Sequence, residues 1–365
     1  MKNGARMAAG AASALLAALG VTCVVLRIPA GAGRQAAVAA AGFIIPQGNY
    51  RTFFSGESDG TPSLTETERP NQPASSRANS SGLEGSSRTA ENSNLPPENE
   101  SSSSLPGTVS TSNGKILELC IGNTGTEAGG IWIKNSTQHQ STLDFAKELL
   151  QLPAVHIKKD GKPQVLIYHT HTTEAFLGDT RTTDKSRSVC AVGEEIASQL
   201  TAASLGVVHD TTYHDYPAYN GSYDRSKVTI QNDLKKYPGI QVTLDIHRDA
   251  MHRTDGTKLK PTAVINGKKA AQIMIICGCD DTGSLAFPDW EYNLRLGLRL
   301  QKALTDNYPG LARPVDFCAR RYNENLTKGS LLIEVGTDAN TLDEAKYSGR
   351  LLGKALALVL NGLTN

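Results

Sequence analysis

The sequence has little cysteine and almost no net charge. Six of its 365 residues are cysteines, and one of them lies in an apolar N-terminal stretch. Cys277 and Cys279 are separated by a single glycine, too close for easy bridging, so no disulfide framework is indicated. A Cys-x-Cys without a matching pair elsewhere is also a poor zinc site. The formal net charge of +1 gives no reason to expect a nucleic-acid partner.

Long apolar runs are also scarce, and only one is long enough to cross a bilayer. Lys2 and Arg6 precede an uncharged run at 7–26, a length that suits a single membrane-spanning helix with its N-terminus in the cytoplasm. A cleaved signal peptide is the alternative, but the run exceeds the usual apolar length of ~7 to 15 residues. A second apolar patch at 36–45 is too short to span. We therefore expect 1–54 to form a membrane anchor and stalk.

The composition changes twice after the stalk. Residues 55–114 are rich in Ser, Thr, Asn, Glu, Pro and Gly, and such a segment cannot bury enough apolar surface to fold. We expect it to be a disordered linker. Residues 115–365 have the size of one large α/β domain, and we assign the chemistry to them.

Within this domain, short apolar runs alternate with stretches of helical periodicity. This alternation predicts an α/β fold, with a mostly parallel twisted sheet covered by helices on both faces. Strands are predicted at 130–134, 165–168, 207–208, 240–246, 271–277 and 331–335, and helices at 141–150, 188–200, 223–237, 290–307 and 342–360.

Polar, metal-competent residues follow three of the predicted strands. His171 and Glu174 come just after the strand at 165–168, His247 follows the next apolar run, and Glu334 ends another. The carboxyl ends of parallel strands meet at one edge, so we expect these side chains to converge. Two histidines and one carboxylate would leave a zinc ion one position open to water, as catalytic sites do. Glu334 could then move a proton from that water to a leaving amine, which indicates amide hydrolysis.

Several segments together resemble the stage II sporulation protein P family. The segments are 169–176, 219–226, 245–249 and 332–336 through Asn340, and the resemblance runs from about Leu117 to the C-terminus. It implies a catalytic domain similar to the zinc-dependent N-acetylmuramoyl-L-alanine amidases. The implied function is a peptidoglycan hydrolase of forespore engulfment, with both amidase and cross-link endopeptidase activity.

The resemblance also implies a location and partners. The implied partners are peptidoglycan, the lytic transglycosylase stage II sporulation protein D, and the membrane protein stage II sporulation protein M. The catalytic domain is expected outside the cytoplasm, on a single-pass anchor in the septal or engulfing membrane. Two alternatives remain: a wall-binding or scaffold protein with weak or no activity, and a metallocarboxypeptidase, which the spacing His171-x-x-Glu174 alone favours.

The resemblance assigns roles to individual residues. It implies that His171 and His247 bind Zn²⁺ and that Glu334 is the catalytic glutamate. Glu174 is preferred as the carboxylate ligand because it resembles the His-x-x-Glu of zinc carboxypeptidases. Amidases usually supply this ligand further along the chain, where the candidates are Asp184, Glu194 and Glu195.

Five further residues are candidates for supporting roles. His169 either supports the zinc ligands from behind or makes a structural hydrogen bond to a neighbouring loop. Strand alternation places Asp245 on the same face as His247, where it either orients the imidazole or caps a turn. Arg225 and Arg248 could bind substrate carboxylates, although surface ion pairs are the commoner use of arginine. Tyr223 is expected to line the peptide groove.

Overall fold

The computed structural model describes residues 108–111 and 114–364. The predicted anchor and stalk, and most of the predicted linker, lie outside the described residues. Described structure begins with a strand at Thr108–Thr111, before residue 115 where the sequence placed the domain boundary. Among the described helices, none has the length and apolar character needed to cross a membrane.

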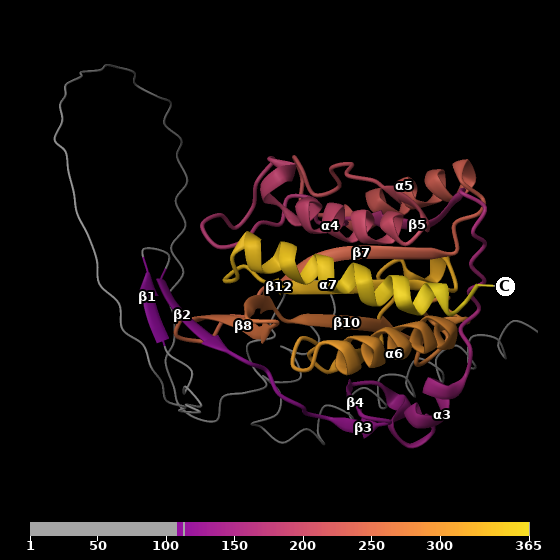
Figure 1. Ribbon diagram of the computed structural model, residues 1–365, viewed down its shortest axis with the longest axis horizontal. Helices are drawn as coiled ribbons and strands as arrows, with labels where there is room; N and C mark the ends of the chain where they lie inside the picture. The colour runs from indigo at the N-terminus through magenta and orange to yellow at the C-terminus, as the bar shows by residue number, and fades with distance from the viewer. Residues whose placement is uncertain (1–107, 112–113, 365) are drawn as a thin grey trace, which may run out of the picture. The chain divides into compact units, whose positions relative to one another are not determined.

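An eight-stranded sheet forms the centre of the domain (Figure 1). Five of its seven neighbouring strand pairs are parallel, so the prediction of a mostly parallel sheet is confirmed. In spatial order the strands are β3 (Thr126–Ala128), β4 (Ile131–Asn135), β11 (Val315–Cys318), β10 (Ile273–Gly278), β12 (Ser330–Thr337), β7 (Val242–Asp249), β5 (Pro163–Tyr168) and β6 (Gly206–His209). The antiparallel pairs are β3 with β4 and β10 with β12.

Helices cover both faces of this sheet, but unequally. Alternate side chains of a strand point to opposite faces. The helices are α3 (Phe145–Leu150), α4 (Val189–Ala202), α5 (Ser222–Lys236), α6 (Trp290–Asn307) and α7 (Leu342–Asn361), with 3-10 helices η2 (Gln138–Ser141), η3 (Lys185–Arg187) and η4 (Glu324–Leu326). Val165 and Ile167 of β5 belong to the large core under α4, α6 and α7, whereas Leu166 and Tyr168 pack with Ile230 of α5. Figure 1 shows α4, α7 and α6 side by side.

A second, four-stranded sheet was not predicted from the sequence. It has the order β1 (Thr108–Thr111), β2 (Gly114–Leu119), β8 (Lys258–Ile265) and β9 (Lys268–Ala271). The sequences of β8 and β9 are rich in lysine, and Pro261 lies within β8. Neither segment therefore shows the apolar run that indicates a buried strand. Pairing with neighbouring strands overrides this weak local preference.

The observed bounds of several helices and strands differ from the predicted ones. The helix predicted from 141 begins at Phe145, because Asp144 accepts a hydrogen bond from the Lys147 amide and so forms the N-cap. The strands β7 and β12 extend further than predicted. His247 and Glu334 therefore lie inside these strands, directly opposite one another in the ladder, rather than just beyond the strand ends.

Glu324, at the start of η4, gives a testable pH dependence of stability. It is buried, its Oε2 accepts from the Gly278 amide at 2.8 Å, and its Oε1 has no hydrogen-bond partner. Burial raises the pKa of its carboxyl well above the ordinary value of 4.5. The folded chain thus keeps a proton that the unfolded chain loses, so the free energy of unfolding falls as pH rises above about 4.5, by about 1.4 kcal/mol per pH unit.

The substitution Glu324→Gln should remove this contribution to the pH dependence of the free energy of unfolding. Urea unfolding between about pH 5 and pH 7 should show a flatter pH dependence for the variant than for the native chain. Glu127→Gln, at an exposed glutamate, serves as the control and should follow the native curve. Parallel curves for native chain and Glu324→Gln would contradict the assignment of a protonated Glu324.

Candidate metal centre

Three adjacent parallel strands build the candidate site. The strands β12, β7 and β5 are neighbours and run in the same direction, so their carboxyl ends lie at one edge of the sheet. His171 and Glu174 follow β5 in a tight turn whose Glu174 amide donates to the His171 carbonyl. His247 lies on β7 and Glu334 opposite it on β12. The structure thus brings together four residues that are far apart in sequence.

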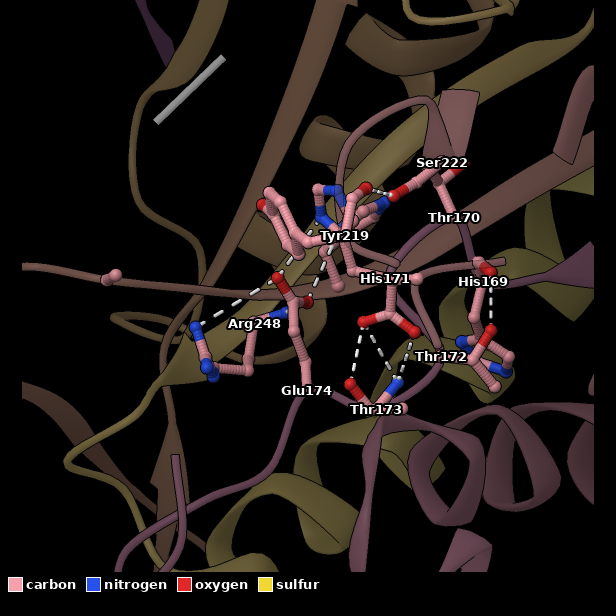
Figure 2. A network of polar contacts seen from close by, with 12 residues as sticks. His169, Thr170, His171, Thr172, Thr173, Glu174, Tyr219, Ser222 and Arg248 are labelled. Atoms are coloured by element: carbon pink, nitrogen blue, oxygen red, sulfur yellow. Dashed lines mark hydrogen bonds and ion pairs between the residues drawn. The ribbon is translucent and has the colours of Figure 1, made fainter. Parts of the chain in front are cut away.

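His171, Glu174 and His247 form a buried cluster of donor atoms. Their exposed fractions are 6%, 4% and 3%. Glu174 Oε1 lies 3.3 Å from His171 Nδ1, Glu174 Oε2 lies 3.3 Å from His247 Nδ1, and one donor atom from each residue lies within 4.8 Å of the others. Figure 2 shows the Glu174 carboxylate in contact with His171 on one side and Arg248 on the other.

The donor set fits a zinc ion. Zinc binds nitrogen and carboxylate oxygen at about 2.0 to 2.2 Å in a tetrahedron, which puts neighbouring donor atoms about 3.3 Å apart. Each oxygen of the Glu174 carboxylate lies at this distance from the Nδ1 atom of one histidine, Oε1 from His171 and Oε2 from His247. Three protein donors leave one coordination position for water or substrate, as in catalytic zinc sites.

The electrostatics of the cluster favour one positive charge at its centre. Burial alone would raise the pKa of Glu174, but the charges of His247 and Arg248 and hydrogen bonds from both histidines hold it well below its usual range. Burial alone would lower the pKa of His247, yet Asp245 and Glu174 raise it well above its usual range. A proton or a metal cation can supply this charge, so metal binding is expected to compete with protonation.

Asp245 lies beside the His247 ring. Its Oδ1 lies 2.8 Å from His247 Nε2, but these two atoms are not aligned as a hydrogen bond. The Asp245 carboxylate accepts from the Thr170 amide at 2.8 Å and from the Thr170 hydroxyl at 2.6 Å. Nδ1 of His247 faces Glu174. A carboxylate in this position can orient a metal-binding imidazole, which is one of the two roles predicted for Asp245.

His169 lies behind the cluster instead of in it. Its Nδ1 lies 2.9 Å from the Ile246 carbonyl oxygen and its Nε2 lies 2.9 Å from His209 Nε2. Burial, followed by the charge of His209, lowers the pKa of His169 to about 3, which keeps the ring neutral. Its contact is to the backbone just before His247, so it supports the strand that carries a donor.

Among the described carboxylates proposed as ligands, Glu174 alone lies with the two histidines. Asp184 caps η3 at an exposed turn, with its Oδ1 accepting from the Ser186 amide. Glu194 pairs with His209 at the surface, and Glu195 pairs with two basic side chains of α7. These three are held by other partners, away from the donor cluster.

The two arginines proposed to bind substrate carboxylates are engaged by the protein itself. Arg248 is buried, and its side chain donates to the carbonyls of Ala175 and Thr180, both at 2.8 Å, while its amide donates to Glu174 Oε2 at 3.1 Å. Arg225 donates to three loop carbonyls, those of His214, Ala218 and Asn220. The guanidinium N–H groups of both arginines are therefore largely occupied by backbone carbonyls. These contacts hold the loops around the site and leave few donors for substrate.

Two tyrosines flank His171. The Tyr223 ring meets His171 edge-on, with 5.6 Å between centroids. Tyr219 stacks on His171 at 4.7 Å, with the Arg181 guanidinium 5.0 Å from its centroid. The Tyr219 hydroxyl is buried and has no hydrogen-bond partner within the described part of the chain, and burial and the charge of Glu174 raise its pKa. In the sequence, Tyr219 stands out only as the first residue of the segment 219–226, because a stacking contact across the fold leaves no local pattern.

Glu334 has the properties of an acid–base group. Its Oε2 is buried and has no hydrogen-bond partner among the residues that the structure describes. Burial, followed by the charge of Asp249, raises the pKa of Glu334 to about 8, and the charge of His247 opposes this rise. Arg313 Nη1 donates to Asp249 at 2.9 Å and so fixes the neighbouring charge. A carboxyl with a pKa near neutrality can both accept and donate a proton.

Comparisons with known proteins agree with the sequence motifs. A family model described as Stage II sporulation protein P (SpoIIP) matches residues 52–357. The Stage II sporulation protein P of Bacillus subtilis (strain 168) is 30% identical over 202 residues, which are 50% of this chain and 47% of that protein. The chain thus spans about half the length of this curated relative.

Solved structures with a similar arrangement include two amidases. N-acetylmuramoyl-L-alanine amidase AmiC2 of Nostoc punctiforme matches with a TM-score of 0.36 and 14% identity, over 55% of this chain and 97% of that one. The CwlD amidase from Clostridioides difficile, solved in complex with the GerS lipoprotein, matches with a TM-score of 0.34 and 12% identity, over 55% and 98%.

Proposed function

Because this chain belongs to the stage II sporulation protein P family, we propose that it is a zinc-dependent peptidoglycan hydrolase of sporulation. It would cut the amide between N-acetylmuramic acid and L-alanine, and peptide cross-links as a second activity. The observation that carries the proposal is the convergence of His171, Glu174 and His247 beside Glu334, a carboxyl whose pKa is raised to about 8. The site lies at the carboxyl ends of parallel strands, where α/β proteins bind ligands.

The donor cluster would hold the zinc ion. Bound there, zinc would supply Lewis acidity, which polarises the amide carbonyl and lowers the pKa of water. The chain's own residues keep the donors ready: Asp245 orients His247, and the Arg248 amide fixes one oxygen of Glu174. Little reorganisation is then needed when substrate binds.

Glu334 would move the proton during hydrolysis. Its Oε2 takes a proton from the attacking water as the new C–O bond forms, and gives it to the amide nitrogen as the C–N bond breaks. The absence of a protein partner on Oε2 leaves this oxygen free for the task. The products are a carboxylic acid and a neutral amine.

Tyr219 would donate a hydrogen bond to substrate. Its hydroxyl is buried beside Glu174 and lacks a partner, so a substrate oxygen would satisfy it. Tyr219→Phe should lower kcat/KM by about 10-fold, the effect of one lost hydrogen bond of roughly 1.4 kcal/mol. Because the hydroxyl has no partner in the free protein, the melting temperature should not change.

Kinetics on a soluble cross-linked muropeptide would test this role. Tyr237→Phe, near the end of α5, is the matched control and should keep native kcat/KM. Native activity in Tyr219→Phe would remove the hydroxyl from the reaction. A lowered melting temperature in that variant would instead indicate a structural role.

We propose a location and partners on the same footing. The run at 7–26 would anchor the chain in the septal or engulfing membrane, with the linker giving the hydrolase reach into the wall. Stage II sporulation protein D would supply glycan strands opened by its transglycosylase activity, and stage II sporulation protein M would hold the complex at the membrane.

Analysis of the products identifies the bonds that are cut. Purified peptidoglycan is incubated with the full chain and the soluble products are separated and weighed by mass spectrometry. Free stem peptides support the amidase, and uncoupled cross-links support the endopeptidase. Release of single C-terminal residues alone would indicate a carboxypeptidase, and a zinc-loaded chain that binds the wall without any product would indicate a scaffold.

A further inference from the structure

A second cluster of metal-competent side chains lies at the opposite edge of the sheet. His139 belongs to η2, which follows β4, and Cys279 and Asp281 follow β10. Because β10 is antiparallel to β12, its carboxyl end points away from the edge that carries Glu334. We propose that His139, Cys279 and Asp281 bind a second divalent transition-metal ion, with zinc as the best match.

The distances suit a tetrahedral ion. Asp281 Oδ1 lies 3.4 Å from His139 Nε2 and 3.4 Å from Cys279 Sγ, and the three donor atoms lie within 4.8 Å of one another. Zinc bonds of about 2.0 Å to nitrogen and oxygen and about 2.3 Å to sulfur put such atoms about 3.3 to 3.5 Å apart. Both contacts fall within this range.

Each donor is held in place by contacts outside the cluster. Asp281 Oδ2 accepts from the Gln138 amide at 3.1 Å, and Oδ1 accepts from the Cys279 thiol, whose proton a bound ion would replace. The Cys279 amide donates to the Cys318 carbonyl at 2.9 Å. The His139 ring packs against Trp290, with 4.9 Å between centroids. The site is therefore largely formed before any ion enters it.

An unsatisfied atom points to a ligand. His139 Nε2 is buried and makes no hydrogen bond to any residue that the structure describes, although Asp281 Oδ1 is 3.4 Å away. Buried polar atoms without partners are uncommon, and an ion between these donors would satisfy this one. The His139 side chain is 26% exposed and the Asp281 side chain 10%, so the cluster lies near the surface.

The donor types select the metal. Thiolate and imidazole suit zinc and similar ions, whereas magnesium and calcium prefer oxygen alone. The sequence analysis considers Cys279 only together with Cys277 and indicates no zinc site there. In the fold, Cys277 Sγ packs against Gly297, whereas Cys279 lies with His139 and Asp281. A bound ion would fasten η2 to the segment after β10.

Cobalt(II) distinguishes this site from the first, because thiolate bound to Co²⁺ gives a charge-transfer band and the first cluster contains no sulfur. The metal-free full chain, titrated with Co²⁺, should develop this band. Cys279→Ser should abolish it, and His139→Gln should weaken Co²⁺ binding at this site by at least about 10-fold. Zinc content should fall from about two ions per chain to about one in Cys279→Ser.

Two controls keep the test decisive. Cys120→Ser removes an exposed thiol outside the cluster and should keep the band, and His171→Ala should keep it too while losing the other ion. Retained peptidoglycan cleavage by Cys279→Ser would show that this variant is folded; if it misfolds, His139→Gln carries the test. Absence of the band in the native chain, or its survival in Cys279→Ser, would overturn the second site.

Discussion

Glu334→Gln should lower the rate of amide hydrolysis by about 10²- to 10⁴-fold, the usual contribution of a general acid–base group. Glutamine keeps the shape of the side chain but cannot take up a proton from water. The carboxyl is not among the donors to the metal, so zinc content should stay native. Initial rates of stem-peptide release, measured beside metal analysis of the same samples, would check both expectations.

The control makes the same chemical substitution away from Asp249 and His247, the charged neighbours of Glu334. Glu127→Gln does this at an exposed position and should keep native rates. A Glu334→Gln variant with native rates would remove Glu334 from the reaction. Loss of zinc together with activity would instead make Glu334 part of the metal site.

His247→Ala should abolish activity together with metal binding at the cluster of His171, Glu174 and His247. The substitution removes one donor, and it leaves the carboxylates of Asp245 and Glu174 buried without the positive partner that lies between them. Removing one partner of a buried charged group typically destabilises a fold by about 3–5 kcal/mol. We therefore expect a lower free energy of unfolding, measured in urea, as well as the loss of one zinc ion.

His156→Ala provides the matched control, because His156 is exposed and uses only its backbone groups to bond Gln241. It should keep native stability and zinc content. If His247→Ala kept both as well, the cluster around Glu174 would not be a metal site. Native stability combined with lost zinc would contradict only the account of the buried charges.

The alternation of apolar runs with stretches of helical periodicity predicted the part of the fold that builds the site. The runs that became β5, β7 and β12 are apolar, and their carboxyl ends meet because the strands are adjacent and parallel. Alternation along β7 also placed Asp245 on the face of His247, and the structure puts the two 2.8 Å apart. The assignment of His171, Glu174 and His247 to zinc stays a prediction.

Features that depend on contacts across the fold could not be predicted. The lysine-rich strands β8 and β9 gain their structure from pairing, and local composition does not indicate it. The residues around Arg225 and Arg248 in the sequence do not indicate that these side chains donate hydrogen bonds to loop carbonyls. His139 and Cys279 are far apart in sequence and come together only because β4 and β10 end at the same edge.

The most direct test of the account is restoration of activity by zinc. The full chain is stripped of metal with a chelator, incubated with intact peptidoglycan, and supplied with zinc in steps while released stem peptides are weighed. We predict no release without metal and a return of release as zinc is added, in native chain but not in His247→Ala. Equal release by the metal-free chain, or none from a zinc-loaded chain given glycan already opened by a transglycosylase, would contradict it.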